Sequence, residues 1–178
     1  MPNWCSGVIK IRGKRDNIKA YLKDLFKPLS LWGGELQVNV QENDFYIKFC
    51  VKDQYKDLDG LDEVIKMYDK GPTFDRWYLK STSRAFIDQG KEISFDFWCD
   101  EQEDEILTIE GFKQAWSIVP EEYTQLSDKH QVDLHIFGYE KGMEYTQEVE
   151  IIKGKITKNK ETEYDGRASA FVFLLALG

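Results

Sequence analysis

Cysteine and histidine are scarce in this chain of 178 residues, which has three of the first and two of the second. Cys5, Cys50 and Cys99 are odd in number and far apart, so the sequence predicts neither a disulfide framework nor a CxxC zinc motif. Each cysteine lies among apolar or aromatic neighbours, which is typical of a buried, reduced thiol. No metal and no cofactor are therefore expected.

Long hydrophobic segments are absent as well. The longest apolar run, Ala170 to Leu177, is far shorter than the roughly 20 residues that cross a bilayer, and we expect it to be a buried terminal strand or helix. The start, Met1-Pro2-Asn3-Trp4, lacks the basic stretch and apolar run of a secretory signal. We expect a cytoplasmic protein with no membrane partner.

Basic residues are outnumbered, and the net charge of −8 hides an uneven distribution. Residues 1–91 carry a net charge of +3, whereas residues 92–178 carry −11, including the run from Asp100 to Glu105. A surface this acidic repels nucleic acid. The run has two interpretations: a solvated turn, or a docking face for a basic protein partner.

Apolar periodicity predicts an α+β fold. Alternating apolar residues indicate strands at residues 8–12, 36–41, 45–51 and 93–99. Helical spacing indicates one helix through residues 18–26, with Asp16 as its N-cap and Pro28 beyond its end, and a second from about Leu58 to Gly71. The order βαββαβ over residues 1–100 predicts a ferredoxin-like unit, mainly antiparallel, with its helices packed on one face of the sheet.

A second unit, rich in αββ order, is predicted for residues 101–178. A strand is favoured over a helix at residues 106–116, and a helix follows from Pro120 to His130. A strand at residues 132–137, and a further long strand or hairpin through residues 153–155, complete it. The two units form separate packed domains or one continuous domain. The loop from Thr73 to Gly90 is the expected junction.

Three segments carry a resemblance. They are Met1-Pro2-Asn3-Trp4-Cys5-Ser6, then Ala115-Trp116-Ser117 followed by Pro120, and Tyr139-Glu140-Lys141-Gly142-Met143. Together they resemble the YubB-like family of uncharacterised phage and plasmid proteins. The chain departs from the family pattern at Gly7, where Asn is expected, and at Ile118-Val119. The resemblance implies a ferredoxin-like domain and a mobile-element origin, but no reaction and no ligand.

The candidate binding residues come from these segments: Asn3, Trp4, Trp116, Tyr139 and Glu140. We expect the three aromatic residues to meet at one sheet edge, where they form either a shared aromatic core or an anchor for a partner.

No catalytic residue is predicted. Cys5 could act as a nucleophile only with His130 or His135 as its base, and a packed thiol is the favoured interpretation. The two histidines share no helical face and lack a third metal ligand in the sequence.

Three functions remain open. The favoured one is a non-enzymatic accessory protein of a mobile element that binds another protein. The second is a single-stranded nucleic-acid-binding module that uses the more basic first half, where the aromatic segment from Phe45 to Phe49 lies on a predicted strand. The third is an enzyme whose pocket the sequence does not reveal.

Overall fold

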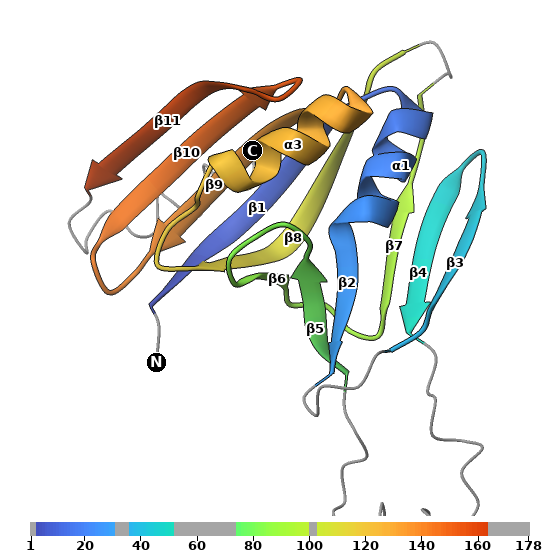
Figure 1. Cartoon of the computed structure of the whole chain (residues 1–178), viewed down its shortest axis with the longest axis horizontal. Coiled ribbons are helices and arrows are strands. Elements are labelled where there is room, and N and C mark those ends of the chain that lie inside the picture. The colour runs from blue at the N-terminus through green and yellow to red at the C-terminus, as the bar shows by residue number, and fades with distance from the viewer. Residues whose placement is uncertain (1–2, 31–35, 52–73, 100–102, 164–178) are drawn as a thin grey trace, which may run out of the picture.

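The computed structural model describes residues 3–30, 36–51, 74–99 and 103–163, which form eleven strands and two helices (Figure 1). In chain order these are β1 (Trp4–Gly13), α1 (Arg15–Leu25), β2 (Phe26–Ser30), β3 (Val38–Asn43), β4 (Tyr46–Val51), β5 (Phe74–Leu79), β6 (Ala85–Ile87), β7 (Glu92–Asp96), β8 (Glu105–Ala115), α3 (Glu121–His130), β9 (Asp133–Glu140), β10 (Tyr145–Ile152) and β11 (Lys155–Glu163).

The strands form two antiparallel sheets. The large sheet has eight strands in the order β11-β10-β9-β1-β8-β6-β5-β2, and the small sheet has three in the order β3-β4-β7. β1 lies near the middle of the large sheet and pairs along its length with β8 and β9. Both neighbours of the first strand in the sheet therefore come from about a hundred residues later in the sequence.

The ferredoxin-like prediction is wrong. It required the early strands to share one sheet, but β3, β4 and β7 form the small sheet while β1 pairs with β8 and β9. The molecule is mostly sheet, with an eight-stranded antiparallel sheet as its main element. Alternation of apolar residues specifies which face of a strand is buried, but not which strand pairs with its edge. That limit explains the error.

One face of the large sheet, here the inner face, packs against both helices and the small sheet. α1 and α3 lie side by side across it, and the small sheet stands next to α1 (Figure 1). Aromatic contacts join the sheets: the Phe26 ring centroid on β2 lies 5.3 Å from that of Phe49 on β4 and 6.0 Å from that of Phe95 on β7. The core is thus a single apolar cluster bounded by two sheets and two helices.

Most local predictions are confirmed. Strands occupy the predicted positions around residues 8–12, 36–51, 93–99, 106–116 and 132–156, and α1 and α3 match the two described helices. Two details are wrong. Asp16 lies in the first turn of α1 rather than at its N-cap, which is Lys14. The expected loop from Thr73 to Gly90 contains β5 and β6, because its half-buried aromatic residues fit sheet pairing.

Two further predictions, the helix from Leu58 to Gly71 and the terminal element from Ala170 to Leu177, lie outside the described residues. The predicted domain boundary near residue 100 stays a prediction, although strands from both sides of it share the large sheet. Neither described helix has the length and apolar character of a membrane-spanning helix.

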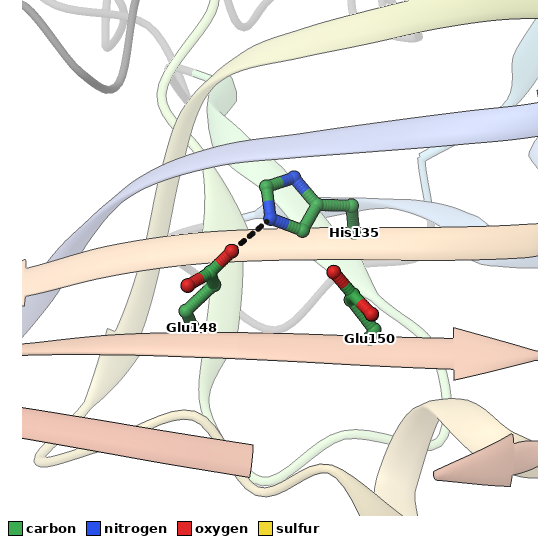
Figure 2. Close-up of side chains that lie close together, drawn as sticks. All are labelled: His135, Glu148 and Glu150. Carbon is green, nitrogen blue, oxygen red and sulfur yellow. Dashed lines mark hydrogen bonds and ion pairs between the residues drawn. The ribbon is translucent and has the colours of Figure 1, made fainter. Parts of the chain in front are cut away.

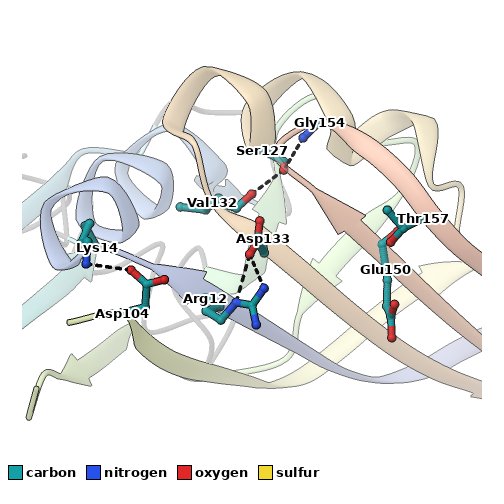
Figure 3. A network of polar contacts seen from close by, with 9 residues as sticks. All are labelled: Arg12, Lys14, Asp104, Ser127, Val132, Asp133, Glu150, Gly154 and Thr157. Atoms are coloured by element: carbon teal, nitrogen blue, oxygen red, sulfur yellow. Dashed lines mark hydrogen bonds and ion pairs between the residues drawn. The ribbon is translucent and has the colours of Figure 1, made fainter.

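Polar contacts fix the end of α3 against the hairpin of β10 and β11 (Figure 3). The Ser127 hydroxyl donates to the Val132 carbonyl at 2.6 Å and accepts the Gly154 N–H at 2.9 Å. Gly154 has a φ of +82°, and a Cβ there would lie 2.5 Å from the Cβ of Asp128. The hairpin turn therefore needs glycine. These contacts hold the strands that carry the candidate sites below.

Candidate functional site

The second face of the large sheet, here the outer face, is not covered by either described helix. The ladders place one row of side chains straight across it, since paired residues in adjacent antiparallel strands point to the same face. From β10 to β2 this row is Thr146, Tyr139, Ser6, Lys113, Phe86, Tyr78 and Lys27. Six of the seven are half-buried and Lys27 is exposed. The outer face therefore brings side chains from seven strands into one row.

The three segments of the family resemblance meet at one end of this sheet, where β1 begins and β8 and β9 end (Figure 1). The Trp116 N–H donates to the Asn3 carbonyl at 2.8 Å. A Cβ on Gly142, in the turn after β9, would lie 3.1 Å from Nδ2 in the side chain of Asn3. Asn3 therefore contacts both other segments.

Trp116 is the most conspicuous residue at this end. Its side chain is 59% exposed, and its backbone has a φ of +73°. A residue other than glycine held in this region costs about 1–3 kcal/mol and persists only where its surroundings impose it. The bond to Asn3 and a hydrogen bond from the Tyr145 hydroxyl to the Trp116 carbonyl impose it here.

Met143, in the turn between β9 and β10, is 69% exposed. We call Asn3, Trp116, Met143 and Tyr145 the Trp116 patch. Its two large apolar side chains face solvent in the described structure, on a backbone that hydrogen bonds hold in place.

Two candidate residues have other roles. Glu140 points to the inner face, is only 3% exposed, and accepts the N–H groups of Gly142 and Met143. It fixes the turn instead of presenting a charge. Trp4 lies on the outer face with its ring edge-on to Phe86, at a centroid distance of 5.8 Å. The segments of Trp4, Trp116 and Tyr139 thus lie at one end of the sheet, where Trp116 is exposed and Trp4 and Tyr139 are half-buried.

Buried amides hold the connection between β8 and α3 beneath the Trp116 patch. Gln147 accepts the Ile118 N–H at 2.8 Å and donates to the Ile118 carbonyl at 2.9 Å. Gln114 accepts the Tyr123 hydroxyl at 2.8 Å. Both glutamines are at most 2% exposed, so these bonds replace water and make the connection rigid.

Cys5 is unsuited to nucleophilic catalysis. It is fully buried, and burial, with the charge of Glu140 as a smaller cause, raises the pKa of its thiol to about 12. At neutral pH it is protonated, whereas a nucleophile must be a thiolate. Each histidine faces a carboxylate instead: His130 lies 2.8 Å from Asp24, and His135 lies 3.0 Å from Glu148.

An aromatic–guanidinium cluster occupies the part of the outer face that runs from β1 to β5. It consists of Trp4, Arg76, Tyr78, Arg84 and Phe86, where Arg76 lies 5.2 Å from the centre of the Phe86 ring and Arg84 lies 6.0 Å from that of Trp4. A groove of about 580 Å³ runs beside it, and its lining residues are Lys27, Pro28, Leu29, Tyr78, Thr82, Ser83, Arg84 and Phe86. Cations, flat rings and hydroxyl groups therefore line one hollow.

The acidic run has mixed placements. Asp100 to Gln102 lie outside the described residues. Glu105 is 6% exposed and accepts the N–H groups of Trp98 and Cys99, while Asp104 pairs with Lys14 at 3.1 Å. Part of the run thus serves the fold.

Sequence reasoning missed two groups of residues. The aromatic–guanidinium cluster was hidden because residues 73–90 were interpreted as a loop. The carboxylates opposite His135 were missed because only the two histidines were compared. The signal was present, since the predicted hairpin through residues 153–155 follows a strand with Glu148 and Glu150 at period two.

Comparison of this chain with family models, curated proteins and solved structures found no match. The resemblance to the YubB-like family therefore stays a prediction that depends on the three segments. The geometry of the sites is the ground for assigning a role.

Proposed function

We propose that this protein is a non-enzymatic binding module that recognises another protein through the Trp116 patch. The observation that carries the proposal is the exposed Trp116 side chain on a backbone of positive φ, held by bonds to Asn3 and Tyr145. Tryptophan and methionine are enriched at the centres of protein interfaces. A partner that buries them gains apolar contact area without having to order the backbone.

The charge beside the patch favours a basic partner. Tyr145 on β10 pairs with Glu163 on β11, and Glu161 lies two residues before Glu163 on β11. Both glutamates are exposed, as is Glu144 in the turn before β10. A partner segment with lysine or arginine beside an apolar anchor would complement this edge.

Site-specific photocrosslinking tests the proposal. A photoreactive phenylalanine analogue at Trp116 should give a discrete crosslinked protein in the cells that produce the chain, and the same analogue at Phe45 should not. Phe45 is a matched control because it is also an exposed aromatic residue, at 69%, in the turn between β3 and β4 of the small sheet. The crosslinked partner is then purified for a direct measurement.

With the purified partner, Trp116→Ala and Met143→Ala should each weaken binding by about tenfold or more, as the loss of an interface anchor does. Phe45→Ala should bind like the unchanged protein. Equal affinities for Trp116→Ala and the unchanged protein would remove the patch from consideration.

A second candidate, single-stranded nucleic acid, is favoured by the aromatic–guanidinium cluster. Bases stack on aromatic rings for about 1–3 kcal/mol each, and cations beside them meet the phosphates. The groove next to Phe86 offers both. Against it stands the net charge of −8.

Fluorescence anisotropy with labelled oligonucleotides at low salt distinguishes the two candidates. Binding that Phe86→Ala weakens, and that Tyr46→Ala on the small sheet leaves unchanged, would establish the second candidate. Absence of binding at low salt would eliminate it.

A further inference from the structure

Three potential metal ligands converge on the outer face, away from the Trp116 patch. His135 on β9 lies directly opposite Glu150 on β10, and Glu148 precedes Glu150 by two residues on the same face. One ligand atom from each of the three residues lies within 4.8 Å of the others. Figure 2 shows the imidazole between the two carboxylates, with its Nε2 3.0 Å from an oxygen of Glu148.

We propose that His135, Glu148 and Glu150 form a binding site for a first-row divalent transition metal. One imidazole nitrogen and two carboxylate oxygens suit Zn²⁺ and its neighbours better than Ca²⁺ or Mg²⁺, which prefer oxygen alone. Ligand atoms around a tetrahedral zinc lie about 3.4 Å apart. The observed separations, up to 4.8 Å, would have to shorten by at most about 1.4 Å to reach that geometry.

The two carboxylates of the cluster already pair with a cationic side chain, that of Lys158. The Lys158 ammonium lies 2.8 Å from Glu148 and 3.8 Å from Glu150. Hydrogen bonds from Lys158 and then from His135 lower the pKa of the Glu148 carboxyl. Without a cation, two carboxylates on one strand face would repel each other. A divalent ion would carry twice the charge of the ammonium and would compete with it for the same oxygens.

The surroundings leave room for further ligands of the ion. A cavity of about 280 Å³ has His135, Glu150, Lys10, Arg12 and Asp133 among its lining residues. Arg12 donates two hydrogen bonds to Oδ2 of Asp133, at 2.6 and 3.0 Å, while the buried Oδ1 of Asp133 has no hydrogen-bond partner in the described structure (Figure 3). With three protein ligands, a tetrahedral ion would have one position left for water or a small anion, and the cavity beside His135 and Glu150 has room for it.

Metal titration of the full chain tests the proposal. Co²⁺ should give the visible absorption bands of a coordinated ion at one ion per chain, and Zn²⁺ should displace it. His135→Gln and Glu150→Gln should each weaken Zn²⁺ binding by at least about tenfold. His130→Gln is the matched control, because it removes the chain's other histidine, which faces Asp24, and it should bind Zn²⁺ unchanged.

Lys158→Gln separates a metal site from an ion-pair network. If Zn²⁺ takes the oxygens that Lys158 now occupies, this variant should bind Zn²⁺ more tightly. Lys155→Gln, with the same charge change at an exposed position on the same strand, should bind with little change. Circular dichroism confirms that each variant folds.

Several outcomes would overturn the site. They are no uptake of Co²⁺ or Zn²⁺ by the unchanged protein, equal affinity in His135→Gln, an equal loss in His130→Gln, or no tightening in Lys158→Gln. Binding that disappears only in Cys50→Ser or Cys99→Ser would assign the ion to the thiols instead.

Discussion

The two faces of the large sheet use the same strands for different purposes. The inner face carries the apolar members of each alternation, such as Ile9, Ile109 and Ile136, all 0% exposed, against α1, α3 and the small sheet. The outer face carries their neighbours, most of which are polar, charged or aromatic and either half-buried or exposed. One face therefore supplies the stability, and the other is available for recognition.

Truncation on the inner face should have the largest effect. Ile109→Ala removes a fully buried side chain from β8 and should lower the free energy of unfolding by about 2–5 kcal/mol, because it leaves a cavity. The adjacent exposed residue provides the control, because Thr108→Ala should change the free energy of unfolding by less than about 0.5 kcal/mol. Urea unfolding measures both. Similar losses for the two variants would contradict the division between faces.

The second largest loss of stability should come from adding one carbon atom between β1 and β9. A Cβ on Gly7 would lie 1.9 Å from the Phe137 carbonyl oxygen, so Gly7→Ala should force the strands apart and cost about 3 kcal/mol. The same reasoning accounts for glycine where the family resemblance leads us to expect Asn. Gly90→Ala is the control, since nothing lies within 4 Å of its Cβ position. Thermal unfolding compares the two.

The buried amide on the inner face should have an intermediate effect. Gln147→Leu leaves the backbone N–H and carbonyl of Ile118 without their partner, at a cost of about 1–3 kcal/mol. It should also loosen the connection that carries Trp116, which hydrogen exchange of the Trp116 and Ile118 amides would show. Gln125→Leu, at an exposed position of α3, should leave that exchange unchanged.

The smallest effect should come from the ion pairs between the two helices. Hydrogen bonds from Lys129 and His130 lower the pKa of Asp24. A lowered folded-state pKa means that this contribution is present above the unfolded value, about 3.9, and is lost as the pH falls through the folded value.

Asp24→Asn should therefore cost less than about 1 kcal/mol at pH 7, since the pair is partly exposed, and the cost should shrink toward zero in acid. Urea unfolding of both proteins from pH 7 to pH 2 measures it. A cost that persists undiminished at pH 2 would show that the effect of Asp24 is not electrostatic.

The local elements were largely predictable. Ile9 and Ile11 at period two mark β1, and Ile18, Leu22 and Leu25 at helical spacing mark α1. Such patterns are visible because each element must hide one face from water, whatever its partners are. β5 and β6 were not predicted, because Trp77 and Ile87 lie in a mainly polar segment and the two strands are too short to show a clear apolar period.

The candidate sites were predictable only in part. The resemblance identified Trp4, Trp116 and Tyr139, and the structure brings their segments to one end of the sheet. It could not reveal that Glu140 turns inward while Trp116 turns outward. That difference depends on a positive φ and on hydrogen bonds from residues distant in the sequence.

By itself, the sequence determined most of the strands and helices, and which side of each is apolar, because these follow from short-range periodicity and burial. Only the tertiary structure decided that β1 pairs with β8 and β9, that β3, β4 and β7 separate into a second sheet, and that His135 faces Glu150. Strand partners are selected by the packing of the whole core and the register of distant ladders, and no local pattern in the chain encodes that choice.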